Sequence, residues 1–534
     1  MERAIRAAAR AGNRLITGST ASVDVTDADA RALLTTALRR MGARLRHRDD
    51  GVDFAFVDRA GEAADRTGGT GLEPARGLAG LTVGLDGSMH SHRGISADSR
   101  IAWAAAGMPA TARLAEQLGA GATRRGVRIG VSLVLEPKTA AFARLLADAG
   151  CSVAVFSAVS ETDPEIAEEL ARDERIAVFA PRKADHGRPA SIVDAEHAAA
   201  ILDWGPEYLI DDGAHLIRLA HSERPAALSR LHGAAEETTS GVRPVREMEA
   251  LGDLRIPVIA VNDARTKTDF DNLIGTGQSC VFAIADVLDD ANEVLPYSGI
   301  AGARWAVVGY GPVGQGVARF AAALGAEVVV VEQDPVRALT ALHDGHEAAP
   351  RETALARADV VVSATGVWHT VDAHAMSMLR DGAVIAVAGG IDDEIAIDEM
   401  RATGWAEREI APSVSEWRAP APHDDRAVLV LAQGGGVNYT AGEGNPIEVM
   451  DLSFATQVAA LVRLMKPGAA AGVHRLSESD ERRVAAAALE ARGGGVDPEP
   501  RMKRAGGAAQ PWAVHRYRSH AQRDGTAIDR TPTL

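Results

Sequence analysis

Residues 306–316 read AVVGYGPVGQG, and residues 328–335 read VVVVEQDP. An apolar strand leads into Gly309, Gly311 and Gly314, a helix follows, and a second strand ends in the acid Glu332. This order is the fingerprint of a dinucleotide-binding βαβ unit, whose glycines allow a tight turn and a close approach to the pyrophosphate. The amides at the helix N-terminus would face the phosphates. The stretch therefore predicts a nicotinamide cofactor; a glycine-rich turn without a ligand is the alternative.

Glu332 indicates which nicotinamide cofactor to expect. It follows the glycines by about 20 residues, where a carboxylate accepts a hydrogen bond from a ribose 2′-hydroxyl and repels a 2′-phosphate. Arg337 is close by in the sequence, and an arginine in this neighbourhood suits a 2′-phosphate. The acid favours NAD, and the loop residues Pro312 and Val313 are expected to line the same cofactor.

The composition indicates a globular, acidic protein. The chain has 534 residues, of which 46% are hydrophobic and 4% aromatic, and a formal net charge of −16. This charge argues against bulk binding to nucleic acid or to anionic membranes. No apolar run approaches the roughly 20 residues that span a bilayer, and the start of the chain lacks the apolar region of a secretion signal. Cys151 and Cys280 offer neither a disulfide framework nor a metal spacing. We expect a cytoplasmic protein without a metal.

The apolar runs predict an α/β fold with two doubly wound, Rossmann-like domains. From about residue 96, short strands alternate with helical stretches, which is the pattern of parallel sheets covered by helices. The first set of expected strands is 127–135, 152–158, 176–181, 208–213 and 256–263. The second set begins in the fingerprint and continues at 328–333, 359–366, 383–390 and 428–435. Ligands of such sheets bind at the carboxyl ends of the strands.

The two ends of the chain stand apart from this alternation. Residues 1–95 contain two helix-like stretches, FAFVDRAG, a glycine-rich passage and LTVGLDG. They predict a small α+β unit with a flexible connection. His90 and His92 are expected to be solvated, because no third metal ligand is near. The last stretch is rich in Gly and Pro and locally basic, and we expect it to form an arm or tail.

Three polar segments carry candidate chemistry. Asp211 and Asp212 end an expected strand, EETTSGV at 236–242 joins two acids to three hydroxyl residues, and NDARTKTDFDN at 262–272 is the densest polar segment of the chain. Lys267 and Asp271 are four residues apart, so they share a face if the segment is helical. A lysine beside a carboxylate near a nicotinamide ring can move the proton of an alcohol that loses hydride. Each segment alone could also be a capped helix terminus with solvated charges.

Together these segments resemble the S-adenosyl-L-homocysteine hydrolase family. NDARTKTDFDN followed by GTGQS is similar to its catalytic segment, GYGPVGQG to its cofactor loop, EETTSGV to its threonine-rich cofactor segment, and EGNPIEVMDLSF (443–454) to a late substrate-domain motif. The resemblance covers roughly residues 100–465, with a trace near the C-terminus. It implies a tightly held NAD that oxidises a ribose 3′-hydroxyl. The 4′-hydrogen then becomes acidic, the 5′-substituent leaves, water adds, and the ketone is reduced again.

The resemblance implies a role for each matching residue. Lys267 and Asp271 would handle the 3′-hydroxyl and neighbouring protons, and Asp212 and Glu237 would complete the polar set around the sugar. The residues expected to hold NAD are Thr238, Thr239, Ser240, Asn272, Gly309, Gly311, Pro312, Val313, Gly314, Glu332, Arg337, Thr365, Asn438 and Tyr517. The implied partners are a small nucleoside or sugar substrate and further copies of the chain, as a dimer or tetramer.

The resemblance also implies domain limits. These are an N-terminal extension at 1–95, a substrate-binding domain at 96–273, an NAD-binding Rossmann domain at 274–440, a return to the substrate domain at 441–475, and a C-terminal region with an oligomerisation arm at 476–534. In WAVHRYR (512–518), Tyr517 keeps the aromatic residue of that arm. Ala513 stands where the family has a lysine that contacts NAD.

The departures from the family concern the substrate pocket. Val134, Gly390 and Asn445 stand where the family has histidines, and none of the three titrates near neutrality. Glu136 and Lys138 stand where the family has an adenine-binding threonine and a glutamate or glutamine. In the family these histidines act around the 5′ leaving group and water, or close over adenine. The equipment for 3′-oxidation is thus retained, and the equipment for 5′-chemistry and base recognition is replaced.

Three functions remain open at this point. The first is an NAD-dependent lyase or hydrolase that oxidises a sugar hydroxyl to drive dehydration, addition or epimerisation on a nucleoside or related sugar, as in nucleoside antibiotic biosynthesis. The second is a true S-adenosyl-L-homocysteine hydrolase with a reorganised pocket. The third is a non-catalytic, NAD-binding regulator, against which the retention of Lys267, Asp271, Asp212 and Glu237 speaks.

Overall fold

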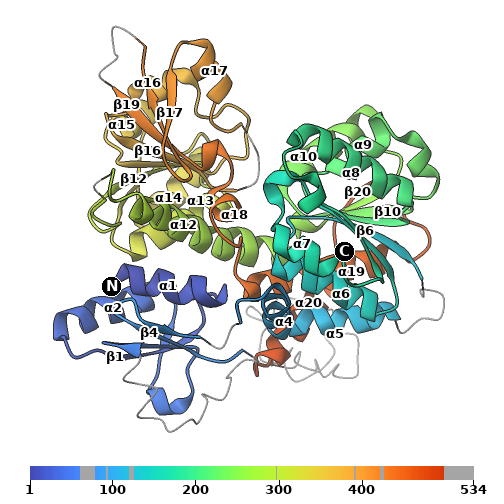
Figure 1. Cartoon of the computed structure of the whole chain (residues 1–534), viewed down its shortest axis with the longest axis horizontal. Coiled ribbons are helices and arrows are strands. Elements are labelled where there is room, and N and C mark those ends of the chain that lie inside the picture. Colours follow the sequence, from blue (N-terminus) through green and yellow to red (C-terminus); the bar gives the residue numbers. More distant parts are fainter. Residues whose placement is uncertain are drawn as a thin grey trace, which may run out of the picture. The chain divides into compact units, whose positions relative to one another are not determined.

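The computed structural model describes residues 1–60, 78–91, 94–119, 126–295, 297–389, 393–420 and 426–497. Gly390 and Tyr517 lie outside these ranges, as do His92 and Ala513. Within the described ranges, three sheets carry the fold (Figure 1). No helix in them is long and apolar enough to cross a membrane, and they hold no cluster of three or more His, Cys, Asp or Glu residues suited to a metal ion.

The first large sheet is fully parallel, with the strand order β20-β11-β10-β9-β6-β7-β8. Its strands are β6 (Arg128–Ser132), β7 (Ser152–Phe156), β8 (Ile176–Phe179), β9 (Tyr208–Asp211), β10 (Gly233–Glu236), β11 (Pro257–Ala260) and β20 (Gly472–His474). The five strands expected in this half of the sequence are confirmed. The short strands β10 and β20 were not expected, because GAAE and GVH lack the run of β-branched residues that marks a buried strand.

Helices cover both faces of this sheet (Figure 1). One face packs against α8 (Ala190–Trp204), α9 (His215–Ser222) and α10 (Thr239–Leu251). The other face packs against α4 (Ala97–Ala106), α5 (Pro109–Gly119), α6 (Pro137–Asp148), α7 (Pro164–Leu170), α19 (Ile447–Leu464) and α20 (Glu478–Ala491). The rings of Phe142 and Phe454 stack at 4.5 Å, which ties α19, from late in the chain, to α6 in this core.

The second large sheet has the order β14-β13-β12-β15-β16-β19-β18-β17. Its strands are β12 (Arg304–Val308), β13 (Glu327–Val331), β14 (Glu347–Ala348), β15 (Val360–Ser363), β16 (Ala383–Val387), β17 (Ala406–Ala411), β18 (Val414–Arg418) and β19 (Ala427–Leu431). The five strands expected here are confirmed, and the sheet is parallel from β14 to β19. The hairpin of β17 and β18 adds an antiparallel edge that was not expected. The charged, exposed strand AEREIA suits such an edge.

This sheet too has helices on both faces. One face packs against α12 (Thr276–Asp290), α13 (Pro312–Ala323) and α14 (Pro335–His343), around the buried Trp305 and Phe320. The other face packs against α15 (Arg351–Leu355), α16 (Ala373–Met378) and α17 (Ile397–Ala402). The chain reaches this sheet through α11 (Arg265–Lys267), a π-helical stretch (Thr268–Gly275) and α12, and it leaves through α18 (Val437–Thr440) and α19.

The N-terminal sheet has the order β2-β1-β3-β4-β5. Its elements are α1 (Glu2–Gly12), β1 (Thr20–Asp24), α2 (Ala28–Arg40), β2 (Arg44–Leu45), β3 (Phe54–Val57), β4 (Leu81–Gly84) and β5 (Met89–His90). The expected α+β unit is instead a mainly parallel α/β sheet, and of its described strands only β4 and β5 pair antiparallel. This topology could not be predicted from the sequence, because the two-residue strand β2 has no apolar run.

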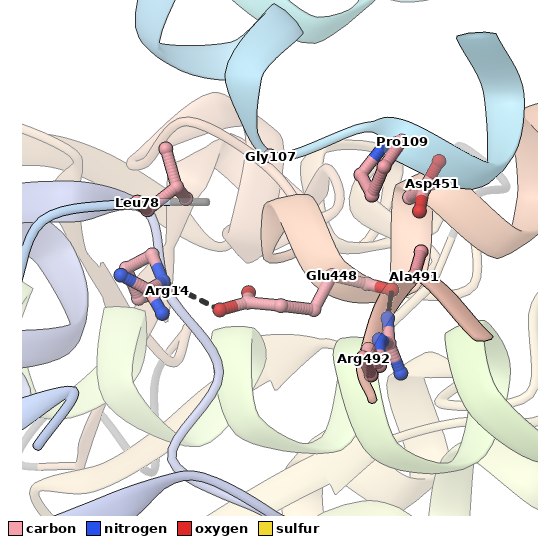
Figure 2. Close-up of a pocket in the computed structure, with 8 residues that line it drawn as sticks. All are labelled: Arg14, Leu78, Gly107, Pro109, Glu448, Asp451, Ala491 and Arg492. Atoms are coloured by element: carbon pink, nitrogen blue, oxygen red, sulfur yellow. Dashed lines mark hydrogen bonds and ion pairs between the residues drawn. The ribbon is translucent and has the colours of Figure 1, made fainter. Parts of the chain in front are cut away.

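A buried ion-pair cluster anchors this N-terminal sheet to α19. Arg14 Nη2 lies 3.1 Å from Asp53 Oδ1, and Arg14 Nε donates to Glu448 Oε1 at 2.5 Å. Figure 2 shows a small cavity beside this contact, with Arg14 and Arg492 both bonded to Glu448. None of the residues that line the cavity was predicted to carry chemistry. The N-terminal residues are therefore part of the packed protein rather than a loose appendage.

Candidate active site

Two pairs of acids mark the carboxyl ends of adjacent strands. Asp211 ends β9 and Glu236 ends β10, and the two residues are in register. Both are buried, and Glu236 accepts hydrogen bonds from the backbone amides of Gly213, Ala214 and Thr238. Burial raises the pKa of Asp211 to about 6 and holds that of Glu236 well above its ordinary value. The hydrogen bonds to Glu236 hold the residues that follow β9 against the end of β10.

Lys267 is the centre of the predicted catalytic set. Its Nζ lies 2.9 Å from Asp271 Oδ2 and 3.8 Å from Glu237 Oε1, and it donates to Asn272 Oδ1 at 2.6 Å. Lys267, Asp271 and Glu237 are each 5% exposed or less. The structure thus brings together a strand end and the π-helical stretch, a rare geometry that is frequent at functional sites. A capped helix terminus with solvated charges does not describe these residues.

Burial sets the protonation behaviour of this cluster. It raises the pKa of Glu237 to about 7, although the charge of Lys267 opposes the shift. Burial alone would lower the pKa of Lys267, but the carboxylates of Asp271 and Glu237 more than offset this, and the pKa is raised. Burial also raises the pKa of Asp212, against the effects of Thr238 and Lys267. The site therefore holds a cationic lysine beside a carboxyl group that titrates near neutrality, which is what general acid–base catalysis needs.

Two other groups complete the surroundings of Lys267. Gln457 of α19 donates to Glu237 Oε2, and Asn272 Nδ2 donates to Asn262 Oδ1 at 2.9 Å. The amide of Asn272, which was expected to hold NAD, is thus engaged with Lys267 and Asn262. Sequence reasoning missed Gln457, because it lies 220 residues from Glu237 and nothing in the α19 sequence marks it.

Three of the altered pocket positions, Val134, Glu136 and Lys138, lie between the end of β6 and the first turn of α6. Val134 is partly exposed in the loop that follows β6, and Glu136 caps the N-terminus of α6. The buried Lys138 Nζ donates to Glu136 Oε2 at 2.7 Å and to the main-chain oxygen of Glu443 at 2.8 Å. Arg100 also donates to the Glu443 carboxylate, at 2.9 Å. Lys138, itself bonded to Glu136, therefore connects the 443–446 loop to the N-terminus of α6, and Asn445 of that loop donates to Asp271.

The glycine loop has the geometry of a dinucleotide site. Gly309 has a φ of 93°, and a Cβ on Gly314 would lie 1.9 Å from the Gly309 oxygen. A Cβ on Gly311 would meet only Arg337 Nη1 within 4 Å, at 3.8 Å, so this backbone is open to a ligand. Glu332 accepts from the Tyr310 amide at 2.7 Å, which places its carboxylate beside the loop. Pro312 and Val313 begin α13 directly after it.

Helix α13 connects this loop to the Lys267 cluster. A Cβ on Gly316 would lie 2.0 Å from the Leu273 oxygen and 3.0 Å from the Gly277 Cα. The helix that starts at the glycine loop is thus in backbone contact with the π-helical stretch that carries Asp271 and Asn272. Residues predicted for cofactor binding and residues predicted for acid–base work therefore belong to one packed arrangement.

The other predicted cofactor residues lie at the carboxyl ends of strands. Thr365 follows β15 and bonds through its amide and hydroxyl to the buried Glu394. Thr238 is the N-cap of α10, Thr239 and Ser240 are its first two residues, and the Thr238 and Ser240 hydroxyls are 3.0 Å apart. Asn438 Oδ1 is buried and has no hydrogen-bond partner among the described residues. An acceptor in this state suits the carboxamide of a nicotinamide, so the residues present fit NAD.

The fold and the site define an α/β protein with two main domains, an additional N-terminal sheet, and a dinucleotide site beside a buried acid–base cluster. The family model for the NAD-binding domain of S-adenosyl-L-homocysteine hydrolase matches residues 277–444. The adenosylhomocysteinase of Thermotoga maritima is 36% identical over 403 residues, covering 75% of this chain and 96% of the relative. The chain belongs to the adenosylhomocysteinase family, and its cofactor is NAD.

Two further relatives are similar over comparable lengths, and one of them is named for a different substrate. The S-inosyl-L-homocysteine hydrolase of Methanopyrus kandleri is 37% identical over 399 residues, covering 74% of this chain and 90% of the relative. The adenosylhomocysteinase of Archaeoglobus fulgidus is 37% identical over 403 residues, covering 74% of this chain and 95% of the relative. The similarity thus extends over nearly the full length of relatives named for two different nucleosides.

Proposed function

We propose that this protein transiently oxidises a secondary hydroxyl of a nucleoside or related sugar and uses the resulting ketone to acidify the neighbouring C–H. Elimination, addition or epimerisation would follow. The observation that carries the proposal is the buried Lys267, held between Asp271 and Glu237 and packed against the helix that begins at the cofactor loop. Bound NAD supplies the hydride acceptor.

The residues of the chain divide the remaining work. Lys267 Nζ orients the substrate hydroxyl and stabilises its oxygen as the proton leaves. Glu237 can take up or return a proton near neutral pH, because burial raises its pKa to about 7. Asp271 keeps Lys267 cationic and in place through the 2.9 Å contact. Burial of the cluster excludes water from these proton transfers.

The altered pocket supports chemistry other than thioether hydrolysis. Val134 cannot transfer a proton, and the Asn445 amide is bonded to Asp271; Gly390 likewise has no titratable group. General acid–base groups contribute about 10²–10⁴-fold in rate, so their loss would slow the departure of a 5′-substituent and the addition of water. A dehydration or an epimerisation needs fewer such groups. We therefore place this chain among enzymes that modify the sugar of a nucleoside.

A second candidate is hydrolysis of S-adenosyl- or S-inosyl-L-homocysteine. The similarity over nearly the full length of relatives with these names supports it. Asp392, Asp393 and Glu443 are then the candidates to act in place of the family's histidines. The third candidate is a non-catalytic partner of an active homologue. Such a protein requires no proton transfer, so this candidate does not explain why Lys267 and Glu237 are buried together.

One assay separates these candidates. Homocysteine release and deuterium uptake at the sugar are measured side by side for both homocysteine nucleosides and for a panel of plain nucleosides. Exchange without release supports the proposal, rapid release supports the hydrolase, and neither across the panel supports the regulator.

Lys267→Ala should abolish exchange and reduction of the bound cofactor while NAD stays bound. Arg265→Ala is the matched control, because Arg265 lies on the same short helix but is exposed and bonded to Glu481. Equal exchange in the Lys267 variant and the wild type would remove this lysine from the mechanism.

A further inference from the structure

Asn445 makes every hydrogen bond that a carboxamide can make. Its Nδ2 donates to Asp271 Oδ1 at 2.5 Å and to Thr276 Oγ1 at 2.9 Å. Its Oδ1 accepts from Ser279 Oγ at 2.7 Å and from Asn438 Nδ2 at 3.1 Å. An amide has two N–H donors and one oxygen with two lone pairs, so no bonding capacity is left for a substrate.

These contacts allow only one orientation of the Asn445 amide. If it were flipped, its oxygen would face the Asp271 carboxylate, and its N–H groups would face the N–H group of Asn438. Both contacts are repulsive, and both are at least partly shielded from water, where unmatched polar groups are costly. The orientation of Asn445 therefore fixes the groups on either side of it: Asp271 receives a donor, and Asn438 must turn its own Nδ2 toward Asn445.

Asn438 is the link to the cofactor side. With its Nδ2 committed to Asn445, its Oδ1 points to the opposite side, where it is buried without a partner among the described residues. An acceptor held in this way matches the N–H₂ group of a nicotinamide carboxamide. It does not match a group that only accepts hydrogen bonds.

We propose that Asn445 is a positioning residue that orients two groups at once, Asp271 as the partner of Lys267 and Asn438 as an acceptor for the NAD carboxamide. The inference rests on the proposed function, because it assigns the ligand of Asn438. A carboxamide does not titrate, so this connection between acid–base cluster and cofactor is the same at every working pH. An imidazole at this position would change its donors with pH.

The cofactor side is tested by competition between two dinucleotides. The full chain is incubated with equal amounts of NAD and 3-acetylpyridine adenine dinucleotide, in which a methyl group replaces the carboxamide N–H₂, and the bound ratio is measured after release. The wild type should prefer NAD about tenfold, the usual effect of one buried hydrogen bond and its unmatched partner. Asn445→Leu should reduce this preference below about threefold, because Asn438 can then turn its Nδ2 toward the acetyl oxygen. Asn292→Leu, at an exposed site, is the control and should leave the preference unchanged.

Asn445→Asp separates the two effects. Its carboxylate still accepts from Asn438, so the preference for NAD should persist. The same carboxylate faces Asp271, and two like charges at this distance raise the pKa of one of them. The titratable groups around Asp271 are Lys267, Glu237 and Asp212. The melting temperature of the variant should fall relative to that of the wild type as the pH rises from 5 to 8, since a carboxyl group with a raised pKa stabilises the fold only while it is protonated. Asn445→Leu should show no such trend.

Each result has a defined meaning. Equal binding of the two dinucleotides by the wild type would overturn the assignment of Asn438, and a preference that survives in Asn445→Leu would overturn the role of Asn445. Parallel pH profiles of Asn445→Asp and the wild type would show that the contact with Asp271 is absent. A wild-type chain that binds neither dinucleotide would instead defeat the proposed function, and the melting profiles would still decide the contact with Asp271.

Discussion

Replacing Glu237 with glutamine should change how the stability of the protein depends on pH. Glu237 is 5% exposed, its Oε1 lies 3.8 Å from Lys267 Nζ, and Gln457 donates to its other oxygen. Its pKa rises from 4.5 to about 7 in the folded protein. At about 1.4 kcal/mol per pKa unit, this rise corresponds to roughly 3 kcal/mol of linkage. A carboxyl group with a raised pKa contributes its full stabilisation below its unfolded pKa, and this stabilisation is lost as the pH rises toward the folded pKa.

The wild type should therefore lose stability relative to Glu237→Gln by roughly 2–3 kcal/mol between pH 5 and pH 8, the part of the linkage that falls in this window. The measurement is urea unfolding of the cofactor-free chain at pH 5, 6.5 and 8, compared between variant and wild type at each pH. The exposed Glu223 gives the control, since Glu223→Gln should follow the wild type. A difference between Glu237→Gln and the wild type that stays within about 1 kcal/mol across the range would refute the argument from burial. With a substrate in hand, the same variant should slow cofactor reduction by about 10²–10⁴-fold.

Two further predictions follow from particular contacts. Gly311→Ala should fold normally and lose NAD binding, because its Cβ meets only a side-chain tip at 3.8 Å but would occupy the path of the pyrophosphate. Gly314→Ala should lose NAD binding and also melt at a lower temperature, because its Cβ would lie 1.9 Å from a backbone oxygen. Equal melting temperatures of the two variants would contradict this. Arg14→Met should destabilise the fold by about 3–5 kcal/mol, because it removes the cation that pairs with the buried Asp53 carboxylate and with the partly buried Glu448 carboxylate. Arg10→Met, at a position with a 65% exposed side chain, should have little effect in the same urea titration, and similar losses in both variants would be evidence against the buried ion pair.

Much of the fold could be predicted from the sequence, because its strands carry their own signal. The valine-rich runs of the second large sheet have high β-propensity and are buried on both faces, so they stand out as continuous apolar segments. The strand β10 has the sequence GAAE and lacks this signal. Its place between β9 and β11 comes from neighbouring strands that supply the hydrogen bonds. The hairpin of β17 and β18 was missed because its outer strand is largely charged.

The site could be predicted only where its contacts are local. Lys267 and Asp271 are four residues apart, and their 2.9 Å contact is the pairing that helical spacing indicates. Glu237 and Gln457 are 220 residues apart, and Asn445 is 174 residues from Asp271. Contacts of this kind depend on how the return of the chain through α19 packs against the first sheet. No local pattern of residues determines that packing.

The hydrogen bonds of Asn445 also bear on whether this site is decayed or adapted. A side chain at position 445 without a donor would leave the buried Asp271 Oδ1 without its hydrogen bond, and an unpaired buried polar group costs about 1–3 kcal/mol. Instead, Asn445 donates to this oxygen and is itself fully satisfied. The acceptor left without a partner next to it is Asn438 Oδ1, on the side where the cofactor is expected. A non-catalytic protein has no reason to keep an unpaired buried acceptor at that place while completing the bonds of Asp271. The distribution of satisfied and unsatisfied groups is therefore an argument for the proposed enzyme and against a non-catalytic regulator.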